Sequence, residues 1–267
     1  MKTPIVTLLT DFGSADPYVG AMKGAMLRIA PDLHLIDLTH DLPPHDVWAG
    51  SYTLAVSAPW YPDGTIHVAV VDPGVGSERR ALVARTRRHL YVAPDNGLLT
   101  AVFDRETVEA IHVVEDSSLG MAPMHPTFHG RDLFGPVGAR LALGLDPAAC
   151  GDAIDDAIRP YRAPPPRHSE DARVDATVLH VDRFGNVTTN VTPEELGRWF
   201  PDTPQPDLAL APGDAPLPWH PSYAFAPPGQ LFLLWGSSGY LELALNQDSA
   251  ARALEVRPGS PPPLHPA

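Results

Sequence analysis

The feature that most constrains the fold is an alternation of short apolar runs with segments of helical periodicity in the first part of the chain. Apolar, β-rich runs are typical of buried strands, and apolar residues three or four apart are typical of helices that pack on a core. Strands that alternate with helices predict an α/β, doubly wound, mostly parallel sheet as the N-terminal domain. We expect strands at 5–9, 33–38, 65–71 and 110–114, a hairpin at 81–85 and 89–93, and helices at 18–30, 46–57, 96–103 and 131–143.

The pattern changes after a proline-rich stretch. Contiguous prolines favour an extended, semi-rigid chain, so residues 161–173 are predicted to link an N-terminal domain, 1–160, to a C-terminal domain, 174–267. Beyond the linker, short β-rich runs are separated by Gly, Asn and Pro turns, which predicts a small β-barrel or sandwich. We expect its strands at 176–181, 187–191, 230–235 and 240–245, one helix at 192–200 and a poorly ordered tail at 258–266.

The charge balance limits the classes of partner. Lys and Arg number 19 against 32 Asp and Glu, so the net charge is −13. Binding of phosphates needs a basic face, so neither nucleic acid nor an anionic membrane surface is expected as a partner. Cys150 is the single cysteine, which allows no internal disulfide, and no run is long enough for a signal core or a membrane span. We therefore expect a soluble cytoplasmic protein.

The decapeptide 70–79 combines features of a ligand site. Asp72 follows the expected strand at 65–71, and a turn with two glycines separates it from Arg79. Open α/β sheets bind ligands at the carboxyl ends of their strands, and glycine lets the backbone approach a ligand closely. The carboxylate and the guanidinium, on two limbs of one loop, are placed to face the same small volume. Taken alone, the decapeptide is explained more simply by a surface ion pair.

Other polar positions have both a functional and a structural interpretation. Asp11, at the end of the first strand, suits the hydroxyls of a ribose or an Asx turn. His129, at a helix entrance, suits the holding or deprotonation of a water, or a helix cap. Asn186 suits the edge of an adenine or an ordinary hairpin, and Ser237 suits a carboxylate or a glycine-rich hairpin. The dipeptide Asn96-Gly97 is predicted to be a βα turn, and a structural role accounts for it.

A metal site is an alternative interpretation of one polar stretch. Residues 37–46 contain three aspartates and two histidines, whose oxygen and nitrogen atoms suit zinc or manganese. No His-Glu-x-x-His motif or cysteine pair accompanies them. A polar loop before a helix explains the stretch equally well.

Six motifs along the chain together resemble the S-adenosylmethionine hydrolase family, also called S-adenosylmethionine hydroxide adenosyltransferases, which is related to fluorinase and chlorinase. Each motif is weak alone, but their order along nearly the whole chain is specific to the family. They are Leu9 to Gly24, Val71 to Gly76 with Arg79, Ala93 to Leu99, Thr127 to Asp132, Asp182 to Asn186 with Thr189 and Asn190, and Ser237 to Leu241.

The resemblance implies a fold and a reaction. The fold is an N-terminal α/β domain with a C-terminal β-barrel, assembled as a homotrimer that binds the nucleoside between subunits. The reaction is attack by water or hydroxide on the ribose C5′ of S-adenosyl-L-methionine, which gives adenosine and L-methionine. A sulfonium is already a good leaving group, so the resemblance implies no metal and no cofactor, only an oriented, desolvated nucleophile.

The resemblance also implies roles for residues of the N-terminal domain. Asp72, Arg79 and His129 match the residues that activate the water. Arg79 would help to stabilise hydroxide, while Asp72 and His129 position it and handle its proton. Asp11 matches the ligand of the ribose hydroxyls. Asp72 and Gly130 stand where fluorinase has tyrosine and serine around its halide, and a carboxylate repels halide, which favours hydrolysis.

In the C-terminal domain, Asn186 matches an adenine contact, Asp182 the residue that takes the methionine ammonium, and Ser237 a ligand of its carboxylate. Thr188 stands where fluorinase has a stacking aromatic residue, and Ser238 where the halogenases have an arginine. Two other hypotheses remain: a metal-dependent hydrolase that uses residues 37–46, and a non-catalytic module that binds adenosine or S-adenosylmethionine.

Overall fold

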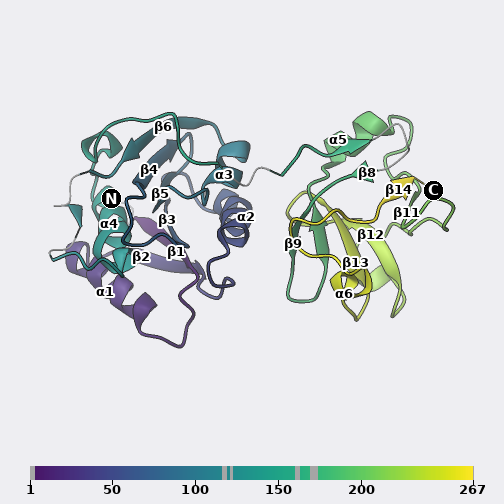
Figure 1. Ribbon diagram of the computed structural model, residues 1–267, viewed down its shortest axis with the longest axis horizontal. Helices are drawn as coiled ribbons and strands as arrows, with labels where there is room; N and C mark the ends of the chain where they lie inside the picture. Colours follow the sequence, from purple (N-terminus) through teal and green to yellow (C-terminus); the bar gives the residue numbers. More distant parts are fainter. Residues whose placement is uncertain (1–3, 116–118, 121–122, 160–162, 169–173, 267) are drawn as a thin grey trace. The chain divides into compact units, whose positions relative to one another are not determined.

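The computed structural model describes residues 4–115, 119–120, 123–159, 163–168 and 174–266. The chain forms two compact units, Met1–Arg162 and Ala163–Ala267, and each has its own sheet and core (Figure 1). Among the helices of the described residues, none combines the length and the apolar character that crossing a membrane requires.

A six-stranded sheet forms the centre of the N-terminal unit, in the order β2-β1-β3-β5-β4-β6. β1 pairs in parallel with β2 and β3, and β3 pairs in parallel with β5, whereas β4 is antiparallel to β5 and β6. The six expected strands are confirmed, with ends that differ by two residues at most. They are β1 (Ile5–Thr10), β2 (His34–Thr39), β3 (Ile66–Val70), β4 (Ala81–Thr86), β5 (Leu90–Pro94) and β6 (Val108–Val113).

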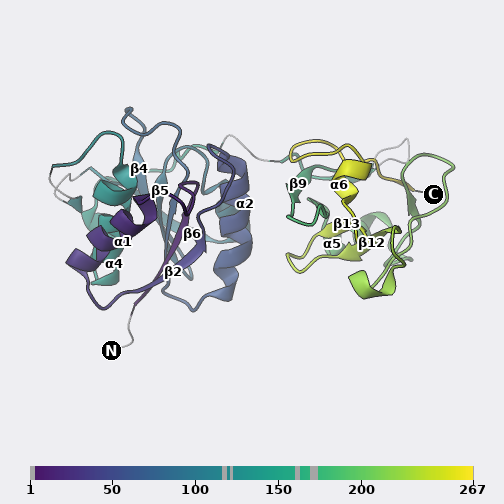
Figure 2. The same cartoon turned by 90° about the horizontal axis from the view of Figure 1, so that it is seen from below.

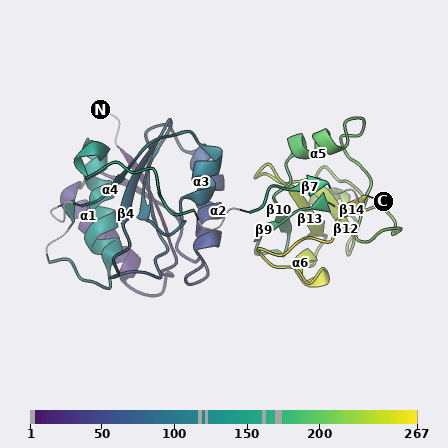
Figure 3. The ribbon, with the colours of Figure 1, turned by 45° about the horizontal axis from the view of Figure 1, so that its top comes forward.

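Helices cover both faces of this sheet, as Figures 2 and 3 show. Successive strand residues point to opposite faces, so Leu8 and Val68 join one core and Leu9 and Ala69 the other. Helices α1 and α4 cover the first core, and α2 and α3 cover the second. Their bounds are α1 (Tyr18–Ile29), α2 (Val47–Ser57), α3 (Thr100–Arg105) and α4 (Gly135–Ala142), with short 3₁₀ turns η1 (Ala58–Trp60) and η4 (Pro147–Ala149).

The helix expected at 131–143 differs from a regular α-helix. It begins as a π-helical segment, η3 (Gly130–Phe134), and continues as α4. Gly138 brings α4 close to the sheet, since a Cβ there would lie 2.5 Å from Val68 Cγ2. The helix expected at 96–103 begins only at Thr100, because residues 96–99 form a turn.

The C-terminal unit contains a four-stranded antiparallel sheet in the order β12-β13-β10-β9. The expected closed barrel is not confirmed, since in the described residues this sheet ends at β9 and β12. Helix α5 confirms the one expected helix, but a second short helix, α6, was not predicted. The elements are β9 (Val178–Val181), β10 (Val187–Thr189), α5 (Pro193–Trp199), η5 (Tyr223–Phe225), β12 (Leu231–Trp235), β13 (Leu241–Leu245) and α6 (Ala250–Ala253).

Two-residue strands order parts of the chain that were expected to lack structure. In the predicted linker, β7 (Arg167–His168) pairs with β8 (Val174–Asp175), while residues 161–162 and 169–173 lie outside the described residues. β14 (His265–Pro266) pairs with β11 (Leu208–Ala209), and Leu264 is fully buried. The expectation of a poorly ordered tail was therefore wrong.

The single cysteine belongs to the core of the N-terminal unit. Cys150 is 1% exposed and packs with residues of the α1 and α4 face. Burial raises the pKa of its thiol to about 11. The thiol is therefore protonated and enclosed at neutral pH.

Candidate active site

The loop after β3 carries two candidate catalytic side chains. All five residues of β3 are buried, and Asp72 follows just beyond its carboxyl end. Arg79 Nε lies 3.0 Å from each carboxylate oxygen of Asp72, and Nη2 also donates to Oδ2. The two side chains are only 4% and 10% exposed, for Asp72 and Arg79 respectively. The ion pair is therefore enclosed, unlike the surface pair that the decapeptide alone allowed.

His129 joins this pair from a distant part of the sequence. It precedes η3, and its Nδ1 lies 2.8 Å from Arg79 Nη2. A guanidinium only donates hydrogen bonds, so Nδ1 must accept, and the neutral imidazole carries its proton on Nε2. Burial lowers the pKa of His129, and the charge of Arg79 lowers it further, although Asp72 and Asp132 act in the opposite direction. The contact and the pKa direction both indicate a neutral histidine at pH 7.

Gly76 allows the two segments that carry Asp72 and His129 to meet. Its φ is +79°, and a Cβ on it would lie 2.6 Å from the carbonyl oxygen of Pro126. Both the left-handed backbone and the close approach require glycine. The loop after β3 therefore packs directly on the segment that leads to His129.

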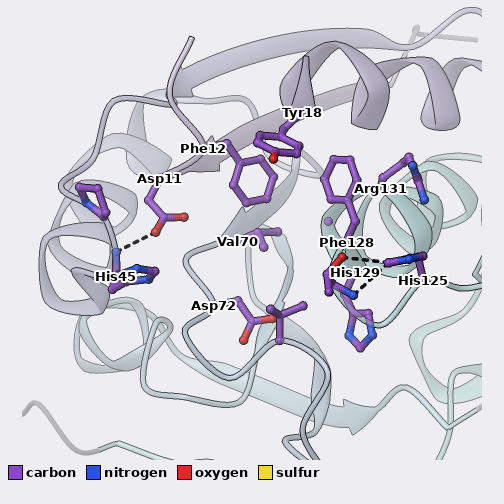
Figure 4. A pocket seen from close by; sticks show the side chains of 14 residues that line it. Asp11, Phe12, Tyr18, His45, Val70, Asp72, His125, Phe128, His129 and Arg131 are labelled. Carbon is purple, nitrogen blue, oxygen red and sulfur yellow. Dashed lines mark hydrogen bonds between the residues drawn. The ribbon is translucent and has the colours of Figure 1, made fainter. Parts of the chain in front are cut away.

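Asp72 and His129 border a cavity of about 560 Å³, drawn in Figure 4. This volume lies in the usual range for small-molecule sites. Asp11 reaches the same cavity from the end of β1, the strand next to β3. The lining residues are Asp11, Phe12, Tyr18, Pro44, His45, Val70, Asp72, Val75, His125, Thr127, Phe128, His129, Gly130 and Arg131.

The backbone of His45 holds Asp11 in place. His45 N donates to Asp11 Oδ2 at 2.8 Å, and Figure 4 draws this contact as the dashed line between these two residues. His45 has φ +68°, a left-handed conformation that is uncommon for a residue other than glycine. Such strained residues gather at functional sites. This role could not be predicted from the sequence, where His45 was interpreted only as a possible metal ligand.

Three aromatic rings form one wall of the cavity. Phe12, Tyr18 and Phe128 pack edge to face, with ring centroids 5.3–6.2 Å apart. The guanidinium of Arg131 lies 4.8 Å from the Phe128 ring centroid. Gly130 makes room for the Phe12 ring, since a Cβ there would lie 2.9 Å from Phe12 Cζ. Sequence reasoning missed this wall, because the rings are spread over three segments.

Asp182 and Asn186, two of the three candidate residues of the C-terminal unit, border a second cavity of about 650 Å³. Asp182 Oδ1 accepts from the backbone N of Phe184 and of Asn186, at 2.9 and 2.8 Å. Asn186 Nδ2 donates to Asp182 Oδ2 at 2.9 Å. This hydrogen bond fixes the orientation of the whole Asn186 amide, including its Oδ1. The lining residues are Asp182, Phe184, Asn186, Tyr223, Leu245, Asn246, Gln247, Asp248, Ser249 and Arg252.

Two further positions of the C-terminal unit lie outside that lining. Ser237 is exposed on the turn between β12 and β13. Thr188 is 4% exposed and pairs with Glu242 of β13. The aromatic side chains that do line the cavity are those of Phe184, which belongs to the motif Asp182 to Asn186 but received no role there, and of Tyr223, which lies outside the motifs.

The polar stretch 37–46 does not gather into a metal centre. Asp37 bonds to Lys23 at 2.7 Å and to His40 at 3.0 Å, and Asp46 accepts from Ala49 N at 2.9 Å as the cap of α2. His45 uses its backbone on Asp11. In the part of the chain that the structure describes, no group of three or more His, Cys, Asp or Glu side chains is arranged to hold a metal ion. Ion pairing and capping therefore account for this stretch.

Comparison with known proteins assigns the chain to a family. Sequence models of the SAM hydroxide adenosyltransferase N-terminal and C-terminal domains match residues 6–151 and 176–262. The chain belongs to the SAM hydroxide adenosyltransferase family. Each family domain falls within one of the two compact units.

Two relatives and one solved structure of another protein match almost the whole length of this chain. An (R)-S-adenosyl-L-methionine hydrolase from Salinispora arenicola is 39% identical, over 97% of this chain and 96% of the relative. A fluorinase from an Actinoplanes species is 27% identical, over 96% and 95%. The crystal structure of an uncharacterized conserved protein from Thermotoga maritima aligns with a TM-score of 0.87 and 32% identity, over 96% and 98%. The higher identity is to the hydrolase.

Proposed function

We propose that this protein hydrolyses S-adenosyl-L-methionine to adenosine and L-methionine. The observation that carries the proposal is the enclosed contact of Asp72, Arg79 and His129 beside a cavity of suitable size, in a chain of the SAM hydroxide adenosyltransferase family. A near-full-length relative with 39% identity bears the name of this hydrolase. The substrate enters with a sulfonium that leaves readily, so the protein has to place and desolvate a water.

The contacts suggest how the water is held. Because Arg79 occupies Nδ1 of His129, the imidazole offers Nε2–H as a donor to the water oxygen. Asp72 then accepts a hydrogen bond from the same water. These two contacts orient a lone pair of the water oxygen, which attacks C5′. The C5′–O bond forms as the C5′–S bond breaks, and its electron pair stays on sulfur as the neutral thioether of methionine. The water proton passes to Asp72 and then to solvent.

The remaining candidate residues bind the substrate in this proposal. Asp11, fixed through Oδ2 by His45 N, turns its other oxygen to the ribose hydroxyls. Asn186 contacts the adenine edge, Asp182 takes the ammonium of the methionine part, and Ser237 binds its carboxylate. Support for these roles comes from the family resemblance and from the shared cavity of Asp182 and Asn186.

We also propose a homotrimer in which each site combines the N-terminal domain of one subunit with the C-terminal domain of its neighbour. The support is the resemblance, together with the distribution of the candidate residues over two separate compact units. The closed β-barrel, the domain limits 1–160 and 174–267, and the cytoplasmic location also stay predictions.

The decisive experiment incubates the purified protein with S-adenosyl-L-methionine and measures adenosine and methionine by mass spectrometry. We expect both products in equal amounts, and at least about 100-fold less of each per unit time with Asp72→Asn as the matched control. Binding of the substrate without products would indicate a non-catalytic module instead. Loss of activity on treatment with a chelator would favour the metal-dependent alternative.

A further inference from the structure

We propose that Asp95 and Asn96 are positioning residues that set the spacing between Asp72 and Arg79. These two residues follow β5 and belong to a turn for which the sequence suggested only a structural role. The inference rests on the hydrolase function proposed above. It assigns to one dipeptide the task of holding both ends of the catalytic loop 72–79.

Asn96 holds the residue that comes before Asp72. Its Nδ2 donates to the carbonyl oxygen of Val71 at 2.8 Å, and its Oδ1 accepts from Leu98 N at 3.2 Å. Val71 is fully buried and lies beyond the end of β3. The ladder between β3 and β5 has already ended at Val68 and Val92, so the Asn96 side chain takes over where the strand pairing stops.

Asp95 holds the residue that comes after Arg79. Its Oδ2 accepts from Arg80 Nε at 2.7 Å, and its backbone N donates to the carbonyl oxygen of Arg80 at 2.9 Å. Its other oxygen, Oδ1, accepts from Ile158 N at 2.8 Å. Asp95 is only 3% exposed, so the carboxylate that binds Arg80 and Ile158 is buried. Removal of the Arg80 guanidinium would leave a buried carboxylate without its charge partner, so this contact favours a fixed position of Arg80.

Arg80 is itself fixed on its outer side. Its Nη1 donates to Asp156 Oδ1 at 2.8 Å, and its Nη2 donates to the Asp156 carbonyl at 3.2 Å. Arg79 and Arg80 are neighbours with separate partners: Arg79 bonds to Asp72 and His129, and Arg80 bonds to Asp95 and Asp156. Asp95 and Asp156 therefore hold Arg80, the residue next to Arg79 in the chain.

The loop between these two anchors needs such a support. It contains Gly74 and Gly76, and glycine allows a backbone many conformations. Val71 and Arg80 flank the loop directly, and both are tied to adjacent residues of the same turn. The turn therefore fixes where the Asp72 carboxylate and the Arg79 guanidinium meet. A displacement of about 1 Å in such a pair lowers a rate by about 100-fold.

The test uses Asn96→Ala and Asp95→Asn, with adenosine release from S-adenosyl-L-methionine as the activity. We expect kcat to fall about 10- to 100-fold while KM changes less than about threefold, because the water-activating pair moves and the substrate contacts do not. Asn96→Ser, whose side chain is too short to reach Val71, serves if Asn96→Ala does not fold. Asn190→Ala is the matched control, since Asn190 in the C-terminal unit bonds to Thr177 N and the Pro164 carbonyl at 2.7 and 2.8 Å.

A second measurement does not depend on activity. The pKa of His129, followed by NMR of its imidazole, should rise in Asn96→Ala and Asp95→Asn, because the Arg79 charge that lowers it moves away. Unchanged kcat and an unchanged His129 pKa, in variants destabilised no more than Asn190→Ala, would overturn the proposal. If the wild-type protein released no adenosine, the proposed function would fail, and the His129 titration would still decide whether the turn positions Arg79.

Discussion

Arg79 connects two side chains that the sequence separates by more than fifty residues. It donates to Asp72 with Nε and to His129 with Nη2, so one planar group fixes both partners. Lysine offers a single nitrogen and has no such fixed fork. The neutral state of His129 therefore depends on Arg79 as well as on burial, which is the larger cause of its lowered pKa.

At the residue scale, the first prediction concerns these partners. Asp72→Asn and His129→Ala should each lower kcat by about 10²- to 10⁴-fold, while KM changes little, because the nucleophile is used in the transition state. Steady-state kinetics of adenosine release checks this. Asp63→Asn is the control, since Asp63 pairs with Arg88 on an exposed surface and should leave kcat unchanged. Near-normal turnover of both variants would contradict the assignment.

A second residue-scale prediction separates the backbone of His45 from its side chain. His45→Gly keeps the N–H that holds Asp11, and the relief of left-handed strain offsets the entropy of glycine, so stability should change by less than about 1 kcal/mol.

His45→Pro removes that N–H and forces φ to about −65°. We expect KM for S-adenosyl-L-methionine to rise in His45→Pro and to stay within about threefold of wild type in His45→Gly, as measured by initial rates. An equal loss in both variants would instead assign the role to the imidazole.

The sequence predicted that Asp72 and Arg79 of the candidate site lie together, and there is a physical reason for this. Asp72 and Arg79 share a short loop at the end of an apolar strand, so local pattern places them together. Their contact with His129 depends on how two loops pack, which no local pattern contains. The wall of Phe12, Tyr18 and Phe128 and the strained backbone of His45 depend on tertiary packing in the same way.

At the element scale, long apolar runs were predictable and short pairings were not. β1 and β3 are mostly apolar and almost entirely buried, and such runs are typical of strands covered on both faces. The pairs β7–β8 and β11–β14 involve two residues per strand, too few to show a period of two. The π-helical start of η3 has no distinct sequence pattern, so 131–143 resembled an ordinary helix.

A prediction at this scale compares two glycines with left-handed backbones. Gly64→Ala, with φ +85° and open space around it, should cost only the backbone strain of about 1–2 kcal/mol. Gly76→Ala carries the same strain and also places a methyl group 2.6 Å from the Pro126 carbonyl oxygen. We expect Gly76→Ala to be less stable in thermal melts and to lose kcat, while Gly64→Ala keeps its kcat. Equal effects would show that loop contact at Gly76 has no catalytic consequence.

At the scale of the whole molecule, a buried histidine pair links stability to pH. His67 is fully buried, donates or accepts with Thr7 Oγ1 at 2.6 Å, and stacks on Tyr91. Burial lowers the pKa of His67 to about 3, with the nearby His89 adding to the effect, and burial also lowers the pKa of His89. The folded chain therefore keeps both rings neutral where the unfolded chain takes up protons.

The low pKa of His67 in the folded chain makes the protein less stable at acidic pH. The unfolded histidine protonates below about pH 6.5 and the folded one only near pH 3, so stability present above 6.5 is lost as the pH falls. His67 alone should remove about 1.4 kcal/mol per pH unit below 6.5. Urea titrations at pH 7, 6 and 5 measure this. The double variant Thr7→Val/His67→Phe, which leaves no buried hydroxyl unpaired, should show a smaller slope, and an unchanged slope would rule out His67 as its source.

A last prediction concerns assembly. His129→Ala and Asn186→Ala, each inactive alone, should regain part of the activity when they are refolded together, because mixed oligomers would contain some intact sites. Activity measured before and after mixing, with mass spectrometry to confirm mixed oligomers, checks this. No recovery in confirmed mixed oligomers would place each site within one chain.

Because Cys150 is enclosed, a thiol label should react only with a cysteine that is introduced at the surface. Cys150 is 1% exposed and burial raises the pKa of its thiol to about 11, so thiol-reactive dyes and spin labels have no thiolate to attack at neutral pH. A cysteine introduced at an exposed position, such as Trp60 at 81% exposure or Glu194 at 77%, would then be the one reactive group of its unit. A chain labelled at both positions reports the distance between its two units in solution, without removal of any native residue from the core.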